Sequence, residues 1–246
     1  WIACWGGLAK FNLKTQKFET FKGQEKLKNL SIRKVAAYED EIIIGTQKKG
    51  IVLLNNKTAD TLEITVKKGI LENSIYNVIK DKETNYYWIA SLGGISIYDL
   101  KKGLIKNITR NEGLPSHLVY SLILSGDKVW ISTTKGIAVI NKNNFSVSSF
   151  NPDEGWQAEE FSEGAYYKDI KGTLFFGGIY GLNYFHPSSI NFSKDLPKIK
   201  VFVDHKEKFD TTVFRNYSEN DLRVEISCIS FSENTNNKIL YKLVGY

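Results

Sequence analysis

A glycine-anchored repeat constrains this chain more than any other feature of its sequence. Five strand-like runs are each followed by a glycine, and successive glycines lie 43, 44, 42 and 45 residues apart, at Gly7, Gly50, Gly94, Gly136 and Gly181. A period of about 40–50 residues is that of a four-stranded blade in a β-propeller. Because helical periodicity is weak throughout, the repeat predicts an all-β chain built of such blades.

Each repeat also predicts its own turns and strands. Glycine suits a hairpin turn that needs positive φ. The alternating strand after it ends on a turn-forming or polar residue that can bond its own backbone, namely Asn12, Asn55, Asp99, Asn141 and His186. Two further strands complete the unit: an outer one at 18–21, 62–65, 105–108 and 147–150, and an inner one at 32–38, 75–80, 118–124 and 164–168. A crossover of roughly ten residues joins outer to inner strand and reaches the next blade.

The pattern stops at Pro197. Beyond it, residues 198–204, 212–217, 222–231 and 239–245 are strand-like without the blade signature. We therefore expect residues 1–196 to form four to five blades, the C-terminal part of a larger propeller, and residues 197–246 to begin an immunoglobulin-like β-sandwich. Four and a fraction blades leave unpaired edges, so the intact parent is expected to contribute more blades upstream.

Composition excludes several classes of function. The formal charge of +6 comes mostly from scattered lysines, with only four arginines, so no nucleic-acid surface is expected. No apolar window is long enough to span a membrane. The chain starts within a strand-like run, so we expect that any native targeting segment has been cut away. Cys4 and Cys228 lie in apolar runs and are expected to be buried free thiols. Two cysteines and three scattered histidines give no metal-ligand spacing, so neither metal nor cofactor is expected.

Particular segments carry a family resemblance. The unit Trp130-Ile131-Ser132-Thr133, joined by the segment Glu112-Gly113-Leu114-Pro115-Ser116-His117, resembles the two-component regulator propeller repeat. Segments 220–226 and 241–246 resemble the opening of the triple-tyrosine (YYY) domain, although Phe231 stands where an early aromatic residue, often Tyr, is expected. This order of modules resembles the periplasmic portion of hybrid two-component sensors, which in gut carbohydrate-degrading bacteria detect glycan fragments.

The resemblance implies a function for the parent and a part of it for this segment. The parent is expected to be a membrane-anchored histidine kinase and response regulator hybrid that regulates transcription and forms a homodimer through its sandwich domain. This segment is expected to be its periplasmic sensor module, to bind an oligosaccharide and to carry no catalysis. Family members usually hold many more blades, in two propellers.

The candidate ligand site lies in the crossovers. The segment 151–161 is longer and more acidic than its siblings, and Trp156 with Gln157 and Glu160 offers a ring face for a sugar and polar groups for its hydroxyls. Packing of Trp156 at a blade junction, or a protein contact, is the alternative. Outer-to-inner crossovers share one face of a blade with the glycine-anchored hairpins, so the expected rim comprises Asn29, Asn73, His117, Trp156, Gln157, Glu160 and Tyr180.

Catalysis is disfavoured by the placement of acids. Glycoside hydrolysis needs two carboxyl groups about 5–10 Å apart on opposite sides of a sugar, whereas the five acids between Asp153 and Glu163 lie in one loop region. His117 lacks the partners of a nucleophilic triad. A propeller-fold polysaccharide hydrolase or lyase, and a propeller that only binds proteins, remain the alternatives to a sensor.

Overall fold

The computed structural model describes residues 1–150, 155–156, 160–190, 198–203, 206–208 and 223–229. The chain divides into two compact units, Trp1–Ser189 and Ile190–Tyr246. The expected domain boundary at residues 196 and 197 lies outside the described residues, as do the strands expected at 212–217 and 239–245.

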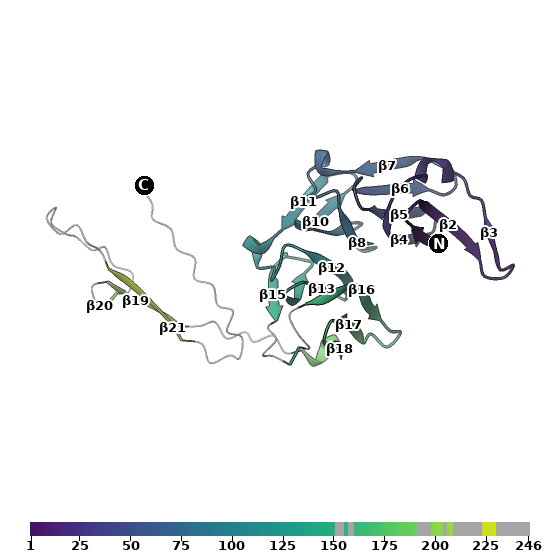
Figure 1. The fold of residues 1–246 in the computed structure, drawn as a ribbon. Coiled ribbons are helices and arrows are strands. Elements are labelled where there is room, and N and C mark those ends of the chain that lie inside the picture. The colour runs from purple at the N-terminus through teal and green to yellow at the C-terminus, as the bar shows by residue number, and fades with distance from the viewer. Residues whose placement is uncertain (151–154, 157–159, 191–197, 204–205, 209–222, 230–246) are drawn as a thin grey trace. The chain divides into compact units, whose positions relative to one another are not determined.

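The first unit consists of five small antiparallel sheets that follow one another along the chain as blades (Figure 1). It is a β-propeller fold. Blade 1 is β1 (Ile2–Cys4), β2 (Gly7–Asn12) and β3 (Lys17–Glu19); blade 2 is β4 (Ile32–Tyr38), β5 (Glu41–Thr46), β6 (Ile51–Asn55) and β7 (Thr61–Ile64); blade 3 is β8 (Ile75–Lys80), β9 (Tyr87–Ser91), β10 (Gly94–Asp99) and β11 (Gly103–Ile108); blade 4 is β12 (Val119–Ser125), β13 (Lys128–Thr133), β14 (Gly136–Asn141) and β15 (Val147–Phe150); blade 5 is β16 (Phe161–Lys168), β17 (Leu174–Gly178) and β18 (Gly181–Phe185).

The predicted strands are confirmed to within a few residues. The inner strands β4, β8, β12 and β16 each form one edge of their sheet. Because neighbouring strands are antiparallel, the glycine-anchored hairpins and the outer-to-inner crossovers lie at one end of every blade, here called the crossover end. The two remaining kinds of turn lie at the opposite end, the turn end.

The described part of the second unit is one three-stranded antiparallel sheet. In it β19 (Lys198–Val203) pairs with β20 (Lys206–Lys208) on one side and β21 (Val224–Ile229) on the other. The immunoglobulin-like sandwich expected for this unit stays a prediction.

Both backbone conformation and lack of space require glycine at the repeat position. Gly50, Gly94 and Gly136 all have positive φ, and a Cβ on any of them would meet the carbonyl oxygen at the end of the outer strand of the same blade. A hydroxyl closes the same hairpin from the strand before: Thr133 Oγ1 donates to the Gly136 carbonyl at 2.9 Å, and its counterparts Thr46 and Ser91 do likewise. The threonine of the Trp-Ile-x-Thr motif therefore stabilises the glycine-anchored hairpin turn.

The residue that ends the next strand caps the following turn as predicted. Asn55 Oδ1 accepts hydrogen bonds from the backbone N–H groups of Lys57 (2.9 Å) and Thr58 (3.0 Å). Asp99 accepts the equivalent pair from Lys101 and Lys102, at 2.7 and 2.8 Å. These two local bonds confirm the predicted structural role of the cap.

Large side chains fill the spaces between blades. Trp88 is 1% exposed and belongs to a core cluster that includes Val119, Val129 and Ala138 of blade 4. Trp130, also fully buried, packs against Phe185 of blade 5 with ring centroids 4.8 Å apart. The prediction that both tryptophans pack between neighbouring blades is confirmed.

The outward faces of the first and last blades are open. Ile2 is 42% exposed and Tyr184 is 69% exposed, whereas the residues at the same repeat positions in blade 3, Ile89 and Ile97, are buried by their neighbours. Cys4 lies in blade 1 and is exposed, so the expectation that it is buried is wrong. An apolar strand pattern does not reveal that one face lacks a covering blade. The Cys228 side chain lies outside the described part.

Polar contacts tie blades 2 and 3 together at the turn end. Glu41 accepts hydrogen bonds from the Tyr87 hydroxyl (2.7 Å) and the Lys80 ammonium (3.0 Å). The backbone N–H of Lys80 donates to the Tyr38 hydroxyl at 3.1 Å, which donates in turn to the Lys80 carbonyl at 3.4 Å. A pocket of about 340 Å³ lies beside these contacts.

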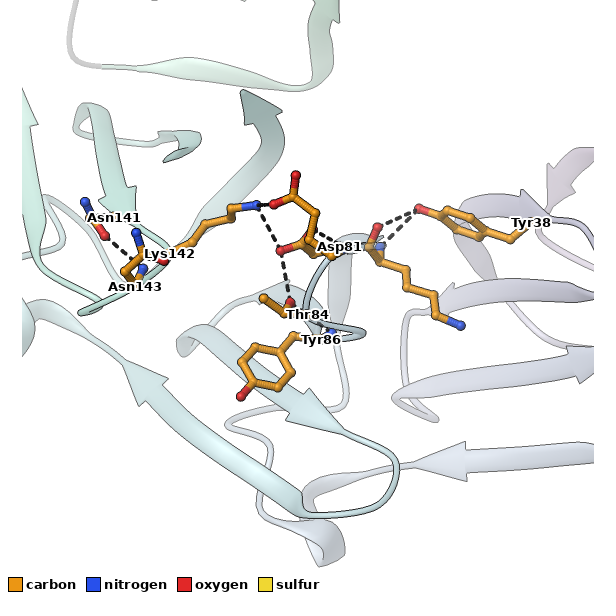
Figure 2. A network of polar contacts seen from close by, with 9 residues as sticks. Tyr38, Asp81, Thr84, Tyr86, Asn141, Lys142 and Asn143 are labelled. Atoms are coloured by element: carbon orange, nitrogen blue, oxygen red, sulfur yellow. Dashed lines mark hydrogen bonds and ion pairs between the residues drawn. The ribbon is translucent and has the colours of Figure 1, made fainter. Parts of the chain in front are cut away.

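A buried ion pair ties blades 3 and 4 at the same end (Figure 2). The Lys142 ammonium lies 3.1 Å from Asp81 Oδ2 and 2.8 Å from Glu83 Oε2, with the Lys142 and Asp81 side chains only 6% and 5% exposed. Burial opposes the charged form of Lys142, but the hydrogen bonds to Glu83 and Asp81 outweigh it and raise its pKa. Thr84 donates a further hydrogen bond to Asp81 at 2.9 Å. The turn end of the middle blades is thus fixed by satisfied polar groups.

Candidate functional site

Two of the expected rim residues have structural roles in the crossovers. The backbone N–H of Asn29 donates to the Gly6 carbonyl at 3.1 Å, and Asn29 has a φ of 63°. Asn73 Oδ1 accepts from the Val66 N–H at 3.0 Å, and the Asn73 carbonyl accepts from the Gly50 N–H at 2.9 Å. The Asn73 bonds connect the end of blade 2 to the beginning of blade 3.

The other rim residues are spread over three segments. His117 is exposed just before β12, and Tyr180 is 76% exposed in the hairpin between β17 and β18. The exposed Glu160 lies beside that hairpin, because its carbonyl accepts from the Ile179 N–H at 3.3 Å. Gln157 lies outside the described residues. The structure therefore brings Glu160 close to the Tyr180 hairpin, and the ligand role of the rim stays a prediction.

Trp156 is half-buried in an aromatic group. Its ring centroid lies 5.3 Å from that of Phe150 and 5.2 Å from that of Phe185, and the latter ring also packs on Trp130. Part of the indole therefore packs at the junction of blades 4 and 5. Its use as a stacking surface for a sugar stays a prediction.

A different set of side chains is gathered at the crossover end by β-bulges. The pairing of inner strand with second strand skips one residue in each of blades 2, 3 and 4, and the skipped residues are Arg33, Tyr76 and Tyr120. In β16 the pairing is interrupted between Phe161 and Tyr166. A bulge leaves its residue unpaired and re-aims the side chain, which is why bulges recur near binding sites.

The bulge residues contact one another across four blades. The Arg33 guanidinium lies over the Tyr76 ring, 4.3 Å from its centroid, and the Tyr76 and Tyr120 rings meet edge to face at 5.4 Å. Arg33 Nε is 3.8 Å from Glu163 Oε1 of β16. We call Arg33, Tyr76, Tyr120 and Glu163 the bulge cluster. Beside it, Lys34 donates from its ammonium to the Tyr166 hydroxyl at 2.7 Å.

The surroundings of Tyr120 favour the neutral form of its hydroxyl group. Burial, followed by the nearby Tyr76 and Glu160, raises the pKa of Tyr120. The Tyr120 hydroxyl is therefore protonated at neutral pH and able to donate a hydrogen bond. Cation, carboxylate and two phenols together can recognise a ligand that both donates and accepts hydrogen bonds.

The bulge cluster is not predicted by the sequence analysis, although the spacing of apolar residues in the inner strands indicates the bulges. Strict strand alternation places inward-facing apolar residues two apart, whereas the apolar pairs Ile32 and Val35, Ile75 and Val78, and Val119 and Leu122 are three apart. The extra residue in each is a bulge position. Recognising the bulge position requires a residue-by-residue comparison of the repeats, because the spacing of their glycines does not show it.

Comparison with known proteins finds similarity to a histidine kinase and to extracellular domains of hybrid two-component systems. No known family profile matches the chain. Histidine kinase P4 from Formosa agariphila is 19% identical over 276 aligned positions, which cover all of this chain and 20% of that protein. The extracellular domain of the hybrid two-component system BT3049 from B. thetaiotaomicron is similar in structure, with a TM-score of 0.55 and 20% identity, over 94% of this chain and 36% of that one.

Two other solved structures are also similar to this chain. The extracellular domain of the hybrid two-component system BT4673, also from B. thetaiotaomicron, gives a TM-score of 0.52 at 18% identity over 80% of this chain and 27% of that one. Sqt1 from Saccharomyces cerevisiae gives 0.54 at 11% identity, over 74% and 52%. This chain spans about a fifth of the curated relative and about a third of the BT3049 domain. Such likeness establishes the fold, and function has to be argued from sites.

Two further observations concern the described residues alone. No group of three or more His, Cys, Asp and Glu side chains among them is placed to hold a metal ion. None of the helices found there has the length and apolar character needed to cross a membrane.

Proposed function

We propose that this chain is part of the extracytoplasmic sensor module of a two-component histidine kinase and response regulator hybrid, and that it detects a glycan-derived ligand. The observation that carries the proposal is the shared architecture with the extracellular domains of two hybrid two-component systems, together with an alignment that covers all of this chain and 20% of a histidine kinase. The parent is proposed to be membrane-anchored, to place this module in the periplasm, to dimerise through its sandwich domain and to regulate transcription.

The geometry supports ligand sensing in a specific way. The turn end of blades 2 to 4 is tied by short polar contacts, including the buried pair of Lys142 and Asp81. The crossover end carries the bulge cluster, whose ion pair is long at 3.8 Å. A ligand shifts a sensor only by binding one arrangement more tightly than another. Groups with unused hydrogen-bonding capacity at one end of the blades are suited to such differential binding.

A single experiment separates this proposal from its rivals. The chain is incubated with a panel of oligosaccharides, and its thermal unfolding and the appearance of cleaved products are followed together. A sensor is expected to be stabilised by at least one saccharide without forming product, because binding to the native state raises its stability by mass action. Product formation would instead establish a propeller-fold hydrolase or lyase. No stabilisation by any saccharide would contradict the glycan proposal and favour a protein-binding propeller.

A further inference from the structure

We infer that the bulge cluster is a binding site for a neutral saccharide ring, an assignment that rests on the proposed sensor function and locates its ligand. The site differs from the expected rim, which consists of crossover and hairpin residues. Its members come from the inner strands of four consecutive blades: Arg33 from β4, Tyr76 from β8, Tyr120 from β12 and Glu163 from β16.

The first argument is the unused hydrogen-bonding capacity of Arg33. A guanidinium has five N–H donors, and charge-assisted bonds normally measure about 2.7–2.9 Å. Among the described residues, Arg33 makes one long hydrogen bond, 3.3 Å from Nη1 to Ser74 Oγ, and one ion pair with Glu163 at 3.8 Å. Stacking on Tyr76 holds the planar fork in place. The group is thus fixed in position while most of its donors are available.

The second argument decides the class of ligand. Arg33 offers only donors and Glu163 only acceptors, and the two lie side by side. Neighbouring hydroxyl groups on a sugar satisfy both, since a hydroxyl accepts from the guanidinium and donates to the carboxylate. A ligand carboxylate, sulfate or phosphate would bring a second negative charge against Glu163, with Glu160 close to Tyr120 as well. The cluster therefore favours a neutral ring over an acidic one.

The third argument concerns the two tyrosine side chains of the cluster. Tyr76 and Tyr120 are half-buried, and within the described chain neither hydroxyl makes a hydrogen bond. Such residues combine an apolar ring with a polar tip, which matches the apolar C–H face and polar rim of a sugar. The raised pKa of Tyr120 keeps its hydroxyl available as a donor.

A fourth observation comes from the residue after the Tyr76 bulge. Asn77 is completely buried, and neither atom of its amide finds a hydrogen-bond partner in the described chain. It pairs across the strands with Ala90, which faces the core shared with blade 4. A buried amide without a partner destabilises the fold, and such groups are usually satisfied by ordered water or a ligand. We assign to Asn77 a water-mediated bond to the bound ring.

The experiment compares matched variants of the full 246-residue chain by calorimetry. The probes are neutral oligosaccharides of glucose, mannose, galactose and xylose, with oligogalacturonate as the acidic counterpart. Arg33→Gln is expected to weaken binding of the neutral ligand about tenfold or more, and Tyr120→Phe about threefold to tenfold, in line with lost charged and neutral hydrogen bonds. Asn77→Ala is expected to weaken binding several-fold while leaving the thermal midpoint unchanged or higher. Tyr86→Phe, at the turn end, is the control and should bind within twofold of the unaltered chain.

The outcomes separate this inference from the proposed function. Neutral saccharide binding that is unchanged in folded Arg33→Gln and Tyr120→Phe would overturn the site and leave the sensor proposal intact. Tighter binding of oligogalacturonate than of the neutral panel would overturn the class of ligand. Tyr120→Phe removes a single oxygen, so its result stands even where Arg33→Gln disturbs folding. Absence of binding by every saccharide would overturn both proposals together.

Discussion

Replacing Trp88 with Ala tests the packing between blades most directly. The indole is 1% exposed, lies between blades 3 and 4, and its Nε1 has no hydrogen-bond partner in the described chain. Its contribution is therefore almost wholly apolar. A buried Trp removes about 150–250 Å² from water, equivalent to about 4–6 kcal/mol at about 25 cal/mol per Å². The remaining Ala and partial collapse of the site reduce this to about 3–5 kcal/mol.

The measurement is urea unfolding followed by circular dichroism, because the substitution itself changes tryptophan fluorescence. The matched control is Trp5→Ala, since Trp5 is 80% exposed and its loss should change the free energy of unfolding by less than about 0.5 kcal/mol. A loss below about 1 kcal/mol for Trp88→Ala, similar to that for Trp5→Ala, would show that the tryptophan does not hold two blades together.

Three further predictions concern other parts of the chain. Trp156→Ala is expected to weaken saccharide binding by roughly 1–3 kcal/mol in calorimetry if the rim holds the ligand, and unchanged affinity in a folded variant would move the site to the bulge cluster. Lys142→Met is expected to destabilise the fold by about 3–5 kcal/mol because Asp81 stays buried without its partner, and Asp81→Leu added to it should recover much of the loss in urea unfolding; additive losses would contradict this. The pKa of Asp99 lies below its usual value because the N–H groups of Lys102 and Lys101 donate to the carboxylate, so its stabilising effect is present above the unfolded-state pKa and is lost as pH falls. Carbon-13 titration should show a lowered midpoint for Asp99, and Asp99→Asn, which restores the cap of the other repeats, should remove this part of the acid sensitivity; an ordinary midpoint would contradict it.

The parts of the fold that depend on local chemistry could be predicted from the sequence. Gly94 and Asp99 act on turns within a few residues of themselves, so their roles are visible in a short window. The period then placed Trp88 at a repeat position whose burial follows from stacking one blade on the next.

The bulge cluster could not be predicted in the same way. Arg33 and Glu163 lie 130 residues apart, and their contact follows from the arrangement of four inner strands. The sequence signal in each inner strand is a single skipped residue, which is much weaker than the regular spacing of the glycines. The rim is predicted from the face that crossovers and hairpins share and from the chemistry of its residues, and the hydrogen bond that Asn73 accepts shows that such a polar residue can instead stabilise the crossover itself.

The buried pair of Lys142 and Asp81 also distinguishes one repeat from another. The residue after the turn cap is Leu13, Asn56, Leu100 and Lys142 in successive blades, so a charge occurs at this position only in blade 4. Similar repeats can exchange partners while a chain folds, and misassembly of neighbours is a characteristic failure of repeat proteins. A buried lysine docked without a carboxylate beside it would be left uncompensated, at a cost of several kcal/mol. The ion pair thus makes blade 4 dependent on a neighbour that presents a carboxylate at this turn, as blade 3 does with Asp81.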